Sequence, residues 1–426
     1  MAASTLTLAA ILKQDYTINF ITEELNQNVA AAEYFDSQDL DVVGDVAVMP
    51  LHTGRNNSVN NAAEGEPLAT PGNQKYERLL VRPKYLYGTA QITGPVLEKA
   101  KTNRGAFEVQ FKGEMDRLVT DMKKRKSQLV FNGGQYIGFV WQKQNSGVFQ
   151  YSGRVDETED PFYGVKTGVY NGVSQQVQFY RLDTYATVGA ATQVTSITSD
   201  TLTLAANINT SAVPTGVPIA VRHLGVNAGG KSLALEQTGF VGNMAQVDHF
   251  GIDRSDPANA IMRGVVKLQD PAVASATALT FDPIVGLQAR IMQNGGGKLD
   301  AMWISPLQLA SFQLLLSNVQ SGTTTIRRDL SKAPGKVDPG DTAFAYANVV
   351  FKESDVAPQG TIFGFGKDTW TRAKLGTPHW VDQSGSPMIK VAGADAYTAT
   401  WADYFETVCR APRMSGCITA IEQVAF

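Results

Sequence analysis

The sequence predicts an α+β protein made of several distinct parts. Three observations support this fold class: one long amphipathic helix over 103–134, a pair of extended segments between residues 46 and 93, and short alternating β-type runs over 139–224. The chain has 426 residues, of which 43% are hydrophobic and 18% are charged. This composition provides enough apolar material for the cores of two or three domains.

Charge and cysteine content narrow the functional class. The net charge of −3 gives no strongly basic field, so a dedicated DNA reader is not expected, although a shell that only encloses DNA is compatible with it. Cys409 and Cys417 lack the companions of a zinc site or a disulfide framework, and we expect both to be ordinary strand residues. No apolar run is long enough to span a membrane and the start lacks a basic signal-peptide region, so we expect a soluble protein assembled in a reducing cytosol.

The first hundred residues are expected to form an arm and a hairpin. Residues 1–44 contain little that could build a core, so we predict an arm that packs on something else. Residues 45–95 hold extended segments at Val46–His52 and Arg78–Thr93, joined by an Asn-, Gly- and Pro-rich connection. Pro83 indicates an edge strand or a bulge. An isolated hairpin is marginal in water, so we predict that it projects onto a neighbouring subunit.

The helix over 103–134 has its apolar residues on one face, from Phe107 to Leu129. The basic run Lys123–Lys126 lies near its C-terminal end, where the helix dipole favours cations, and Gly133-Gly134 ends it. At 1.5 Å per residue it would be roughly 40 Å long, which suits a strut across a flat molecule.

The remaining chain divides into three regions. Residues 139–224 are Thr-, Val- and Gln-rich and are predicted to be a small all-β insert. Residues 225–360 are predicted to be α/β, with a helix from Asp282-Pro283, a buried strand Ala301–Ile304 and a second helix from Ser305-Pro306. Strands are predicted within 361–412, and a last strand within 413–426.

One motif suggests chemistry. Gly225, Gly230, Lys231 and Ser232 match the phosphate-binding pattern G-x-x-x-x-G-K-[ST]. Gly239 and Gly242 interrupt the segment that follows, so no long helix is positioned to receive a phosphate, and we interpret the match as coincidence. The four histidines share no metal spacing, and the Asp248–Asp256 region is interpreted as a polar turn. No catalytic residue, metal site or cofactor is predicted.

The order of the parts resembles the major capsid proteins of tailed bacteriophages with the HK97 fold. The resemblance covers nearly the whole chain except 139–224. It depends on the arm, the hairpin, the helix ending in Phe131-Asn132-Gly133-Gly134, the Met302–Pro306 segment that opens a helix, and the late strands around Tyr397–Arg410.

The resemblance implies a wedge-shaped, non-enzymatic subunit. Residues 1–44 would be the N-terminal arm, 45–95 the E-loop, 96–138 and 361–412 the P-domain with its spine helix, and 225–360 with 413–426 the A-domain. Residues 139–224 would be an insertion subdomain, which we interpret as an outward or intersubunit stabilising element.

The resemblance also implies partners. Pentamers and hexamers would form an icosahedral virion shell around double-stranded DNA held without sequence specificity, with a separate scaffolding protein, a portal protein and a decoration protein as further partners. Basic residues of the hairpin, the spine helix and the 322–340 loop are the candidate intersubunit contacts: Arg55, Lys75, Arg78, Arg82, Lys84, Lys123, Lys124, Arg125, Lys126, Arg327 and Arg328. Two alternatives remain: an encapsulin-like cellular compartment, and a nucleotide-binding protein that uses Gly225–Ser232.

Overall fold

The computed structural model describes part of the chain. The described residues are 39–42, 44–56, 58–59, 61, 64, 66–67, 70–94, 118, 121–141, 145–154, 169–170, 173–198, 200–210, 213–227, 229–272, 276–295, 299–319, 344–346, 349–354, 356–366, 368–382 and 388–422. Three predicted features therefore lie outside them: the arm before residue 39, the first part of the spine helix, and the loop with Arg327 and Arg328.

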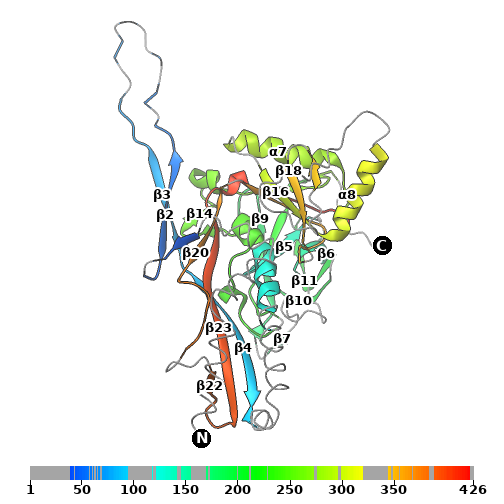
Figure 1. Cartoon of the computed structure of the whole chain (residues 1–426). Helices are drawn as coiled ribbons and strands as arrows, with labels where there is room; N and C mark the ends of the chain where they lie inside the picture. Colours follow the sequence, from blue (N-terminus) through cyan, green and yellow to red (C-terminus); the bar gives the residue numbers. More distant parts are fainter. Residues whose placement is uncertain are drawn as a thin grey trace.

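The molecule is elongated, with two extensions on a compact body (Figure 1). A hairpin rises away from the body at one end, and a long pair of strands runs down to the opposite end. The hairpin consists of β2 (Ala47–Gly54) and β3 (Lys75–Val81), and the long pair consists of β4 (Lys84–Thr93) and β23 (Ala396–Cys409).

The long pair is the centre of a six-stranded sheet, here called the long sheet. β4 pairs antiparallel with β23 from Ala396 to Phe405. The other members also lie beside β23 or extend the sheet from it: β1 (Asp39–Asp41), β20 (Trp370–Lys374), β21 (His379–Trp380) and β22 (Met388–Lys390). The pairing joins segments about 300 residues apart, which local sequence patterns do not reveal.

The division between hairpin and sheet differs from the prediction. Arg78–Thr93 is expected as one hairpin strand, but the chain breaks at Arg82-Pro83, so that β3 pairs with β2 and β4 joins the long sheet. The physical reason is that Pro83 has no N–H to donate to a ladder. The projecting hairpin is therefore shorter than 45–95.

The described part of the spine helix covers residues 121–132 and lies against the long sheet. Gly88 of β4 permits the approach, because a Cβ there would lie 2.7 Å from Sδ of Met122. The helix ends where predicted: the Gly133 N–H donates to the Leu129 carbonyl at 3.2 Å, and Gly134 has φ +82°.

The predicted β insert corresponds to a closed antiparallel barrel that begins slightly earlier, at Tyr136. Its strands are β5 (Tyr136–Val140), β6 (Asn145–Gly153), β9 (Gln176–Arg181), β10 (Thr187–Ile197), β11 (Thr201–Asn209) and β12 (Ile219–His223). Two short strands, β7 (Val169–Tyr170) and β8 (Val173–Ser174), pair with each other beside it. Alternating apolar residues such as Phe149, Phe179 and Val194 fill the barrel interior.

A second six-stranded sheet, here called the body sheet, lies in the compact body. Its order is β15 (Val265–Leu268), β24 (Gly416–Thr419), β19 (Ile362–Gly366), β16 (Leu299–Ile304), β18 (Val349–Glu353) and β17 (Phe344–Tyr346). β19 was predicted with the 361–412 strands of the other domain, but it pairs with β16 and β24. A continuous apolar run can be buried in either sheet, so its sequence does not specify which.

Helices and short turns complete the body. α8 (Pro306–Val319) begins directly after Ser305, as predicted. α7 (Phe281–Gly295) begins at Phe281, so Asp282 lies in its first turn and is not the predicted cap; Ile284, Leu287 and Ile291 of α7 are fully buried. Among the described residues, the remaining elements are α6 (Phe240–Ala245), β13 (Asp248–His249), β14 (Ile252–Asp253) and three 3-10 helices at Leu233–Leu235, Pro257–Met262 and Pro412–Met414. Asp256 caps the second of these, as predicted for the polar turn.

Candidate assembly surfaces

The hairpin has one anchored face and one open face. Ala47, Met49, Leu79 and Val81 point inward and pack with Ile252, Met262, Ala373 and Val408 of the body. The Leu80 N–H also donates to the Phe250 carbonyl at 2.9 Å. The stem is therefore held to the body along one side, and the direction in which the tip projects is fixed by buried contacts.

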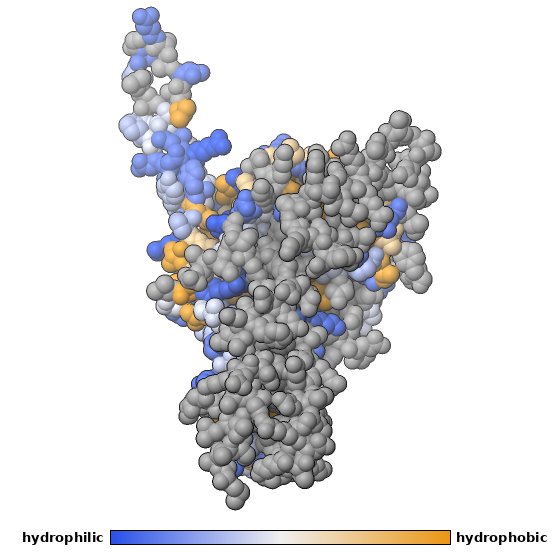
Figure 2. Space-filling view, viewed as in Figure 1, coloured by the Kyte–Doolittle hydropathy of each residue, from blue (hydrophilic) through white to orange (hydrophobic). Residues whose placement is uncertain are grey.

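The open face of the stem carries apolar and aromatic side chains. Val48 and Leu80 are directly opposite each other and remain 52% and 43% exposed. Pro50 and Arg78 form the next pair on this face. His52 and Tyr76 follow, with ring centroids 5.2 Å apart, and Tyr76 is 67% exposed. Figure 2 shows that the tip beyond them is largely hydrophilic, with hydrophobic residues around the base. This face can bury apolar area only against a further surface.

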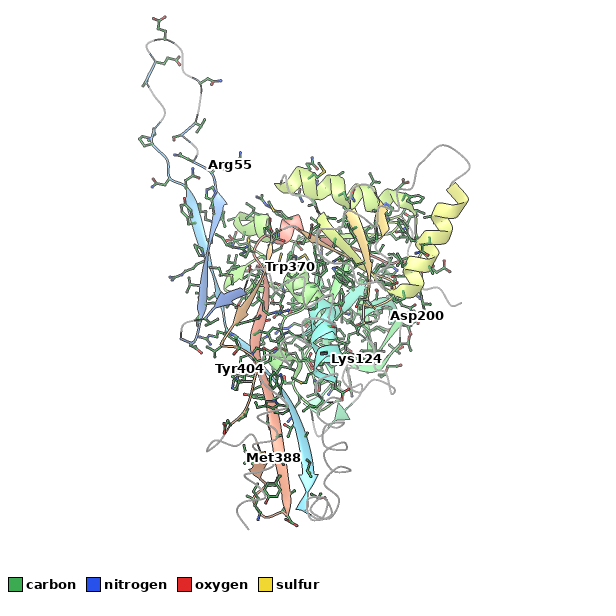
Figure 3. All side chains as sticks on the ribbon, viewed as in Figure 1. Arg55, Lys124, Asp200, Trp370, Met388 and Tyr404 are labelled. Carbon is green, nitrogen blue, oxygen red and sulfur yellow. The ribbon has the colours of Figure 1, made fainter. Side chains whose placement is uncertain are left out.

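The predicted basic contacts on the hairpin fall into two groups. Arg55 and Arg78 are exposed, and Figure 3 shows Arg55 where the stem meets the tip. Lys75 lies 3.4 Å from Glu77, and Arg82 lies 3.7 Å from Asp45, both in exposed pairs. Lys84 differs: its ammonium lies 3.1 Å from the buried carboxylate of Glu406 and donates to the Glu236 carbonyl at 2.7 Å. Lys84 therefore has its interaction partners within the same subunit.

A second exposed surface lies on the long sheet and is here called the aromatic face. Tyr85 and Tyr87 of β4 are more than half exposed, and both rings contact Tyr404 of β23 edge-on, at 5.1 and 5.8 Å between centroids. His379 packs on Tyr404 from the other side at 5.7 Å. Figure 3 shows Tyr404 partway along the strand. The K-Y-L-Y alternation indicated a strand, but only the fold shows that both tyrosines lie on its open side.

The spine-helix cations are mostly directed into the subunit. Arg125 forms a buried ion pair with Glu236, and Lys126 lies 3.0 Å from Asp403 of β23 and 5.0 Å from the Phe405 ring centroid. Lys123 is also buried, and Lys124 is exposed. The structure thus gives Arg125 and Lys126 partners within the chain in place of a neighbouring subunit. The reason is that the long sheet and the segment at 236–239 cover the helix faces that carry them.

Glu236 is the centre of the buried charges, here called the junction cluster. Its carboxylate accepts from Arg125, from Arg154 at 2.6 Å and from Asn227 at 2.7 Å. Burial alone would raise the pKa of Glu236, but the charges of Arg154 and Arg125 outweigh it and lower that pKa to about 2. The carboxylate therefore stays ionised and joins the spine helix, the barrel and the 225–232 turn.

Glu406 extends the junction cluster to the long sheet. One of its oxygens accepts from the backbone N–H groups of Thr238 and Thr407, and the other faces Lys84. Burial raises the pKa of Glu406 despite the nearby ammonium. Because Lys84 is the first residue of β4 after the hairpin, the cluster fixes the base of the hairpin relative to the spine helix. Its acidic members were not identified from sequence, since 111 residues separate Arg125 from Glu236 and more than 300 separate Lys84 from Glu406.

The Gly225–Ser232 segment does not form a phosphate cradle. The N–H groups of Asn227 and Gly230 donate to carbonyls of the same turn at 2.8 and 2.9 Å, and the Lys231 N–H donates to the Asn227 side chain at 3.0 Å. Ser232 caps the 3-10 helix at Leu233–Leu235. A phosphate loop needs outward N–H groups and a following helix, so this geometry disagrees with the nucleotide-binding hypothesis.

Three further side chains that could take part in chemistry, Cys409, Cys417 and His249, are buried within the fold. Cys409 and Cys417 are buried free thiols in strands, as predicted, and burial raises the pKa of Cys409 to about 11. Burial, with the charge of Arg254, lowers the pKa of His249 well below its ordinary value, and its Nε2 lies 2.9 Å from the Cys409 carbonyl. Within the described ranges, no group of three or more His, Cys, Asp or Glu side chains is arranged to hold a metal ion.

Among the helices that the structure describes, none has the length and apolarity needed to cross a membrane.

Comparisons with known proteins bear on the fold. No protein-family model matches the sequence, and no curated protein matches it. The cyanophage A-1(L) capsid asymmetric unit is similar over 93% of this chain and 93% of that chain, with a TM-score of 0.51 and 9% identity. The capsid of an empty GTA particle is similar over 93% of this chain and 91% of that chain, with a TM-score of 0.43 and 8% identity. An encapsulin complex from Synechococcus elongatus PCC 7942 is similar over 94% of this chain and 92% of that chain, with a TM-score of 0.41 and 7% identity.

The likeness to the cyanophage structure extends over nearly the whole length of both chains. The protein therefore has a capsid-protein fold, and the resemblance seen in the sequence is confirmed at the level of the fold. A shared fold does not by itself establish a function, which has to be argued from the surfaces described above.

Proposed function

We propose that the chain is the structural subunit of an icosahedral virion shell, assembled as pentamers and hexamers in a bacterial cytoplasm around double-stranded DNA. The role is structural and not enzymatic. The observation that carries the proposal is the projecting stem on a capsid-protein fold, with Val48, Leu80 and Tyr76 open along its outer face. A monomer gains nothing from holding these side chains away from its own body.

The proposed shell is held by many modest contacts. The open stem face contributes apolar burial at about 25 cal/mol per Å² removed from water. Arg55, Lys75, Arg78 and Arg82 would meet acidic groups of a neighbour, and such exposed pairs contribute less than about 1 kcal/mol each, so they set register more than strength. Closure of the shell multiplies these contacts. Lys123 and Lys124 are retained as minor candidates, together with Arg327 and Arg328 of the 322–340 loop.

Further partners follow from the proposal. A separate scaffolding protein would guide assembly, a portal protein would occupy one vertex, and a decoration protein would bind the finished shell. The barrel at 136–223 is proposed as an outward or intersubunit stabilising element, because it is closed and has a core of its own.

The first test is electron microscopy of the purified protein, alone and co-expressed with the neighbouring genes. Closed shells of uniform size, or rings of five and six, are the expected result. Nuclease-resistant DNA inside the shells would support a virion, and a protein cargo without DNA would indicate a cellular compartment. Small monodisperse particles under both conditions would contradict a shell role.

The hairpin tip provides a sharper test. Replacing residues 56–73 by an Asn-Gly turn keeps β2 and β3 paired, because the stem ladder runs from Ala47–Val81 to Gly54–Lys75. We expect a folded subunit that fails to assemble, as measured by sedimentation velocity and circular dichroism. Normal shells from this variant would show that the tip is dispensable.

A further inference from the structure

The body sheet ends on one side in an open strand. β15 pairs in parallel with β24, and among the described residues no strand pairs with its other side. The N–H groups of Val265 and Gln269 donate inward, to Ser415 at 3.4 Å and Thr419 at 2.8 Å. Because peptide groups alternate along a parallel strand, those of Val266 and Leu268 point away from β24. An edge of this kind is a template for an added strand.

A hollow of about 640 Å³ lies along this edge. The hollow is lined by residues 266–271, by Gly216, by Thr277, Ala278 and Thr280, and by Asp282-Pro283 at the start of α7. Apolar side chains are prominent in the lining, namely Val266, Leu268, Pro271, Ala278 and Pro283. The space therefore lies where a further strand would run, and it is large enough for a few extended residues.

A buried polar atom of Gln269, the residue that follows β15, lacks a partner. Gln269 is 5% exposed, and its Nε2 donates to the Ala278 carbonyl at 3.1 Å and to Thr280 at 2.9 Å. Its Oε1 has no hydrogen-bond partner in the described structure. An unsatisfied buried acceptor costs about 1–3 kcal/mol. Because this oxygen is closed to solvent, it is a feature of the packing at the end of β15 and not a contact for an added strand.

We propose that β15 accepts an added strand from residues 4–8 of the N-terminal arm of a second copy of this chain. The inference goes beyond the shell role and does not depend on it, because a soluble dimer or oligomer could use the same site. It assigns a function to the open edge and to the hollow beside it.

The sequence of the arm fits this site. Ser4-Thr5-Leu6-Thr7-Leu8 alternates polar and apolar residues at the strand period, with β-branched threonines, and residues 1–12 contain no charged side chain. Leucines on one side of such a strand match the apolar lining of the hollow. Thirty-eight residues precede β1, and at about 3.3 Å per residue they span up to roughly 125 Å, enough to reach another copy.

The experiment uses the full chain with a photoreactive benzoylphenylalanine in place of Leu6. Unlabelled protein carrying the probe is mixed with isotopically labelled protein, irradiated, and digested for mass spectrometry. We expect cross-links from position 6 of one isotopic form to residues 265–271 of the other. Cross-links confined to a single copy, or directed mainly to other surfaces, would overturn the proposal.

Two proline variants test the strand pairing itself. Val266→Pro removes an outward N–H and leaves the ladder to β24 intact, whereas the control Val266→Ala keeps that N–H. We expect at least a tenfold loss of cross-linking for Val266→Pro and less than a threefold change for Val266→Ala. Thr7→Pro changes only the arm and leaves β15 unaltered. It should therefore give a similar loss of cross-linking, even if Val266→Pro destabilises the subunit. Undiminished cross-linking in Thr7→Pro would refute strand addition. Cross-linking without shells would instead refute only the shell function.

Discussion

At the scale of single residues, Glu236 has the most consequential surroundings. Its carboxylate lies between Arg125 and Arg154, and all three side chains are buried. Glu236→Gln keeps the size of the side chain but leaves two guanidinium groups without their counter-charge. We expect a loss of about 3–5 kcal/mol in the free energy of unfolding, as measured by chemical denaturation. The exposed Glu422→Gln serves as the control, and an equal effect in both would contradict this account.

The same residue predicts a pH dependence. The pKa of Glu236 is about 2 in the folded protein and 4.5 ordinarily, so the unfolded state binds more protons between these values. The stabilisation from Glu236 is therefore complete above pH 4.5 and is lost as pH falls towards 2. The difference in unfolding free energy between wild type and Glu236→Gln should shrink over that interval. A difference independent of pH would show that the carboxylate charge is not responsible.

In this cluster, the sequence predicts the basic residues of the spine helix but not the acidic residues that pair with them. The basic run Lys123–Lys126 and its place near the helix end could be predicted, because both depend on local spacing. The partners could not, since Glu236 and Asp403 are far away in the chain and become neighbours only when the long sheet forms. Charged side chains were therefore expected on the surface, where most of them lie in proteins.

At the scale of elements, two glycines set how closely the spine helix approaches the 236–239 segment. A Cβ at Gly239 would lie 2.4 Å from the Gly133 nitrogen and 2.6 Å from the Leu129 carbonyl oxygen. Gly239→Ala would force two backbone segments apart, and we expect a loss of about 3 kcal/mol or more. In Gly229→Ala, the nearest atom is a side-chain oxygen at 3.4 Å, so its denaturation midpoint should match that of wild type. Similar midpoints for both variants would contradict the close approach.

The elements that were predicted well are those with local signals. Ser305-Pro306 marks a helix start through the preset φ of proline, Asp282-Pro283 falls in the first turn of α7, and Gly133-Gly134 marks a helix end. The division at Pro83 and the membership of β19 depend on which strand lies alongside, and alternation or apolar runs do not encode that choice.

At the scale of the whole molecule, the hairpin has one face used in folding and an opposite face that the proposed assembly would use. Its inner face is anchored by Met49, Leu79 and Val81, so the outer face can change without loss of the stem. The order of parts in the sequence was enough to predict a capsid-like fold, because that order survives when individual motifs do not. The open edge of β15 and the aromatic face emerge only from the tertiary structure, since exposure is a property of the assembled sheets.

The double variant Val48→Lys with Leu80→Lys tests this separation. Both side chains point outward and oppose each other, so two lysines make the stem face cationic and repel each other across the ladder, at a cost of roughly 0.2–1 kcal/mol. We expect an unfolding midpoint close to that of wild type and loss of shells or capsomers by sedimentation and electron microscopy. Val148→Lys with Leu235→Lys adds the same charge at other exposed apolar positions, at 46% and 66% exposure, and should assemble. Equal loss of assembly in both pairs would attribute the effect to net charge, whereas loss only in the stem pair would locate the contact between copies on the open face of the hairpin.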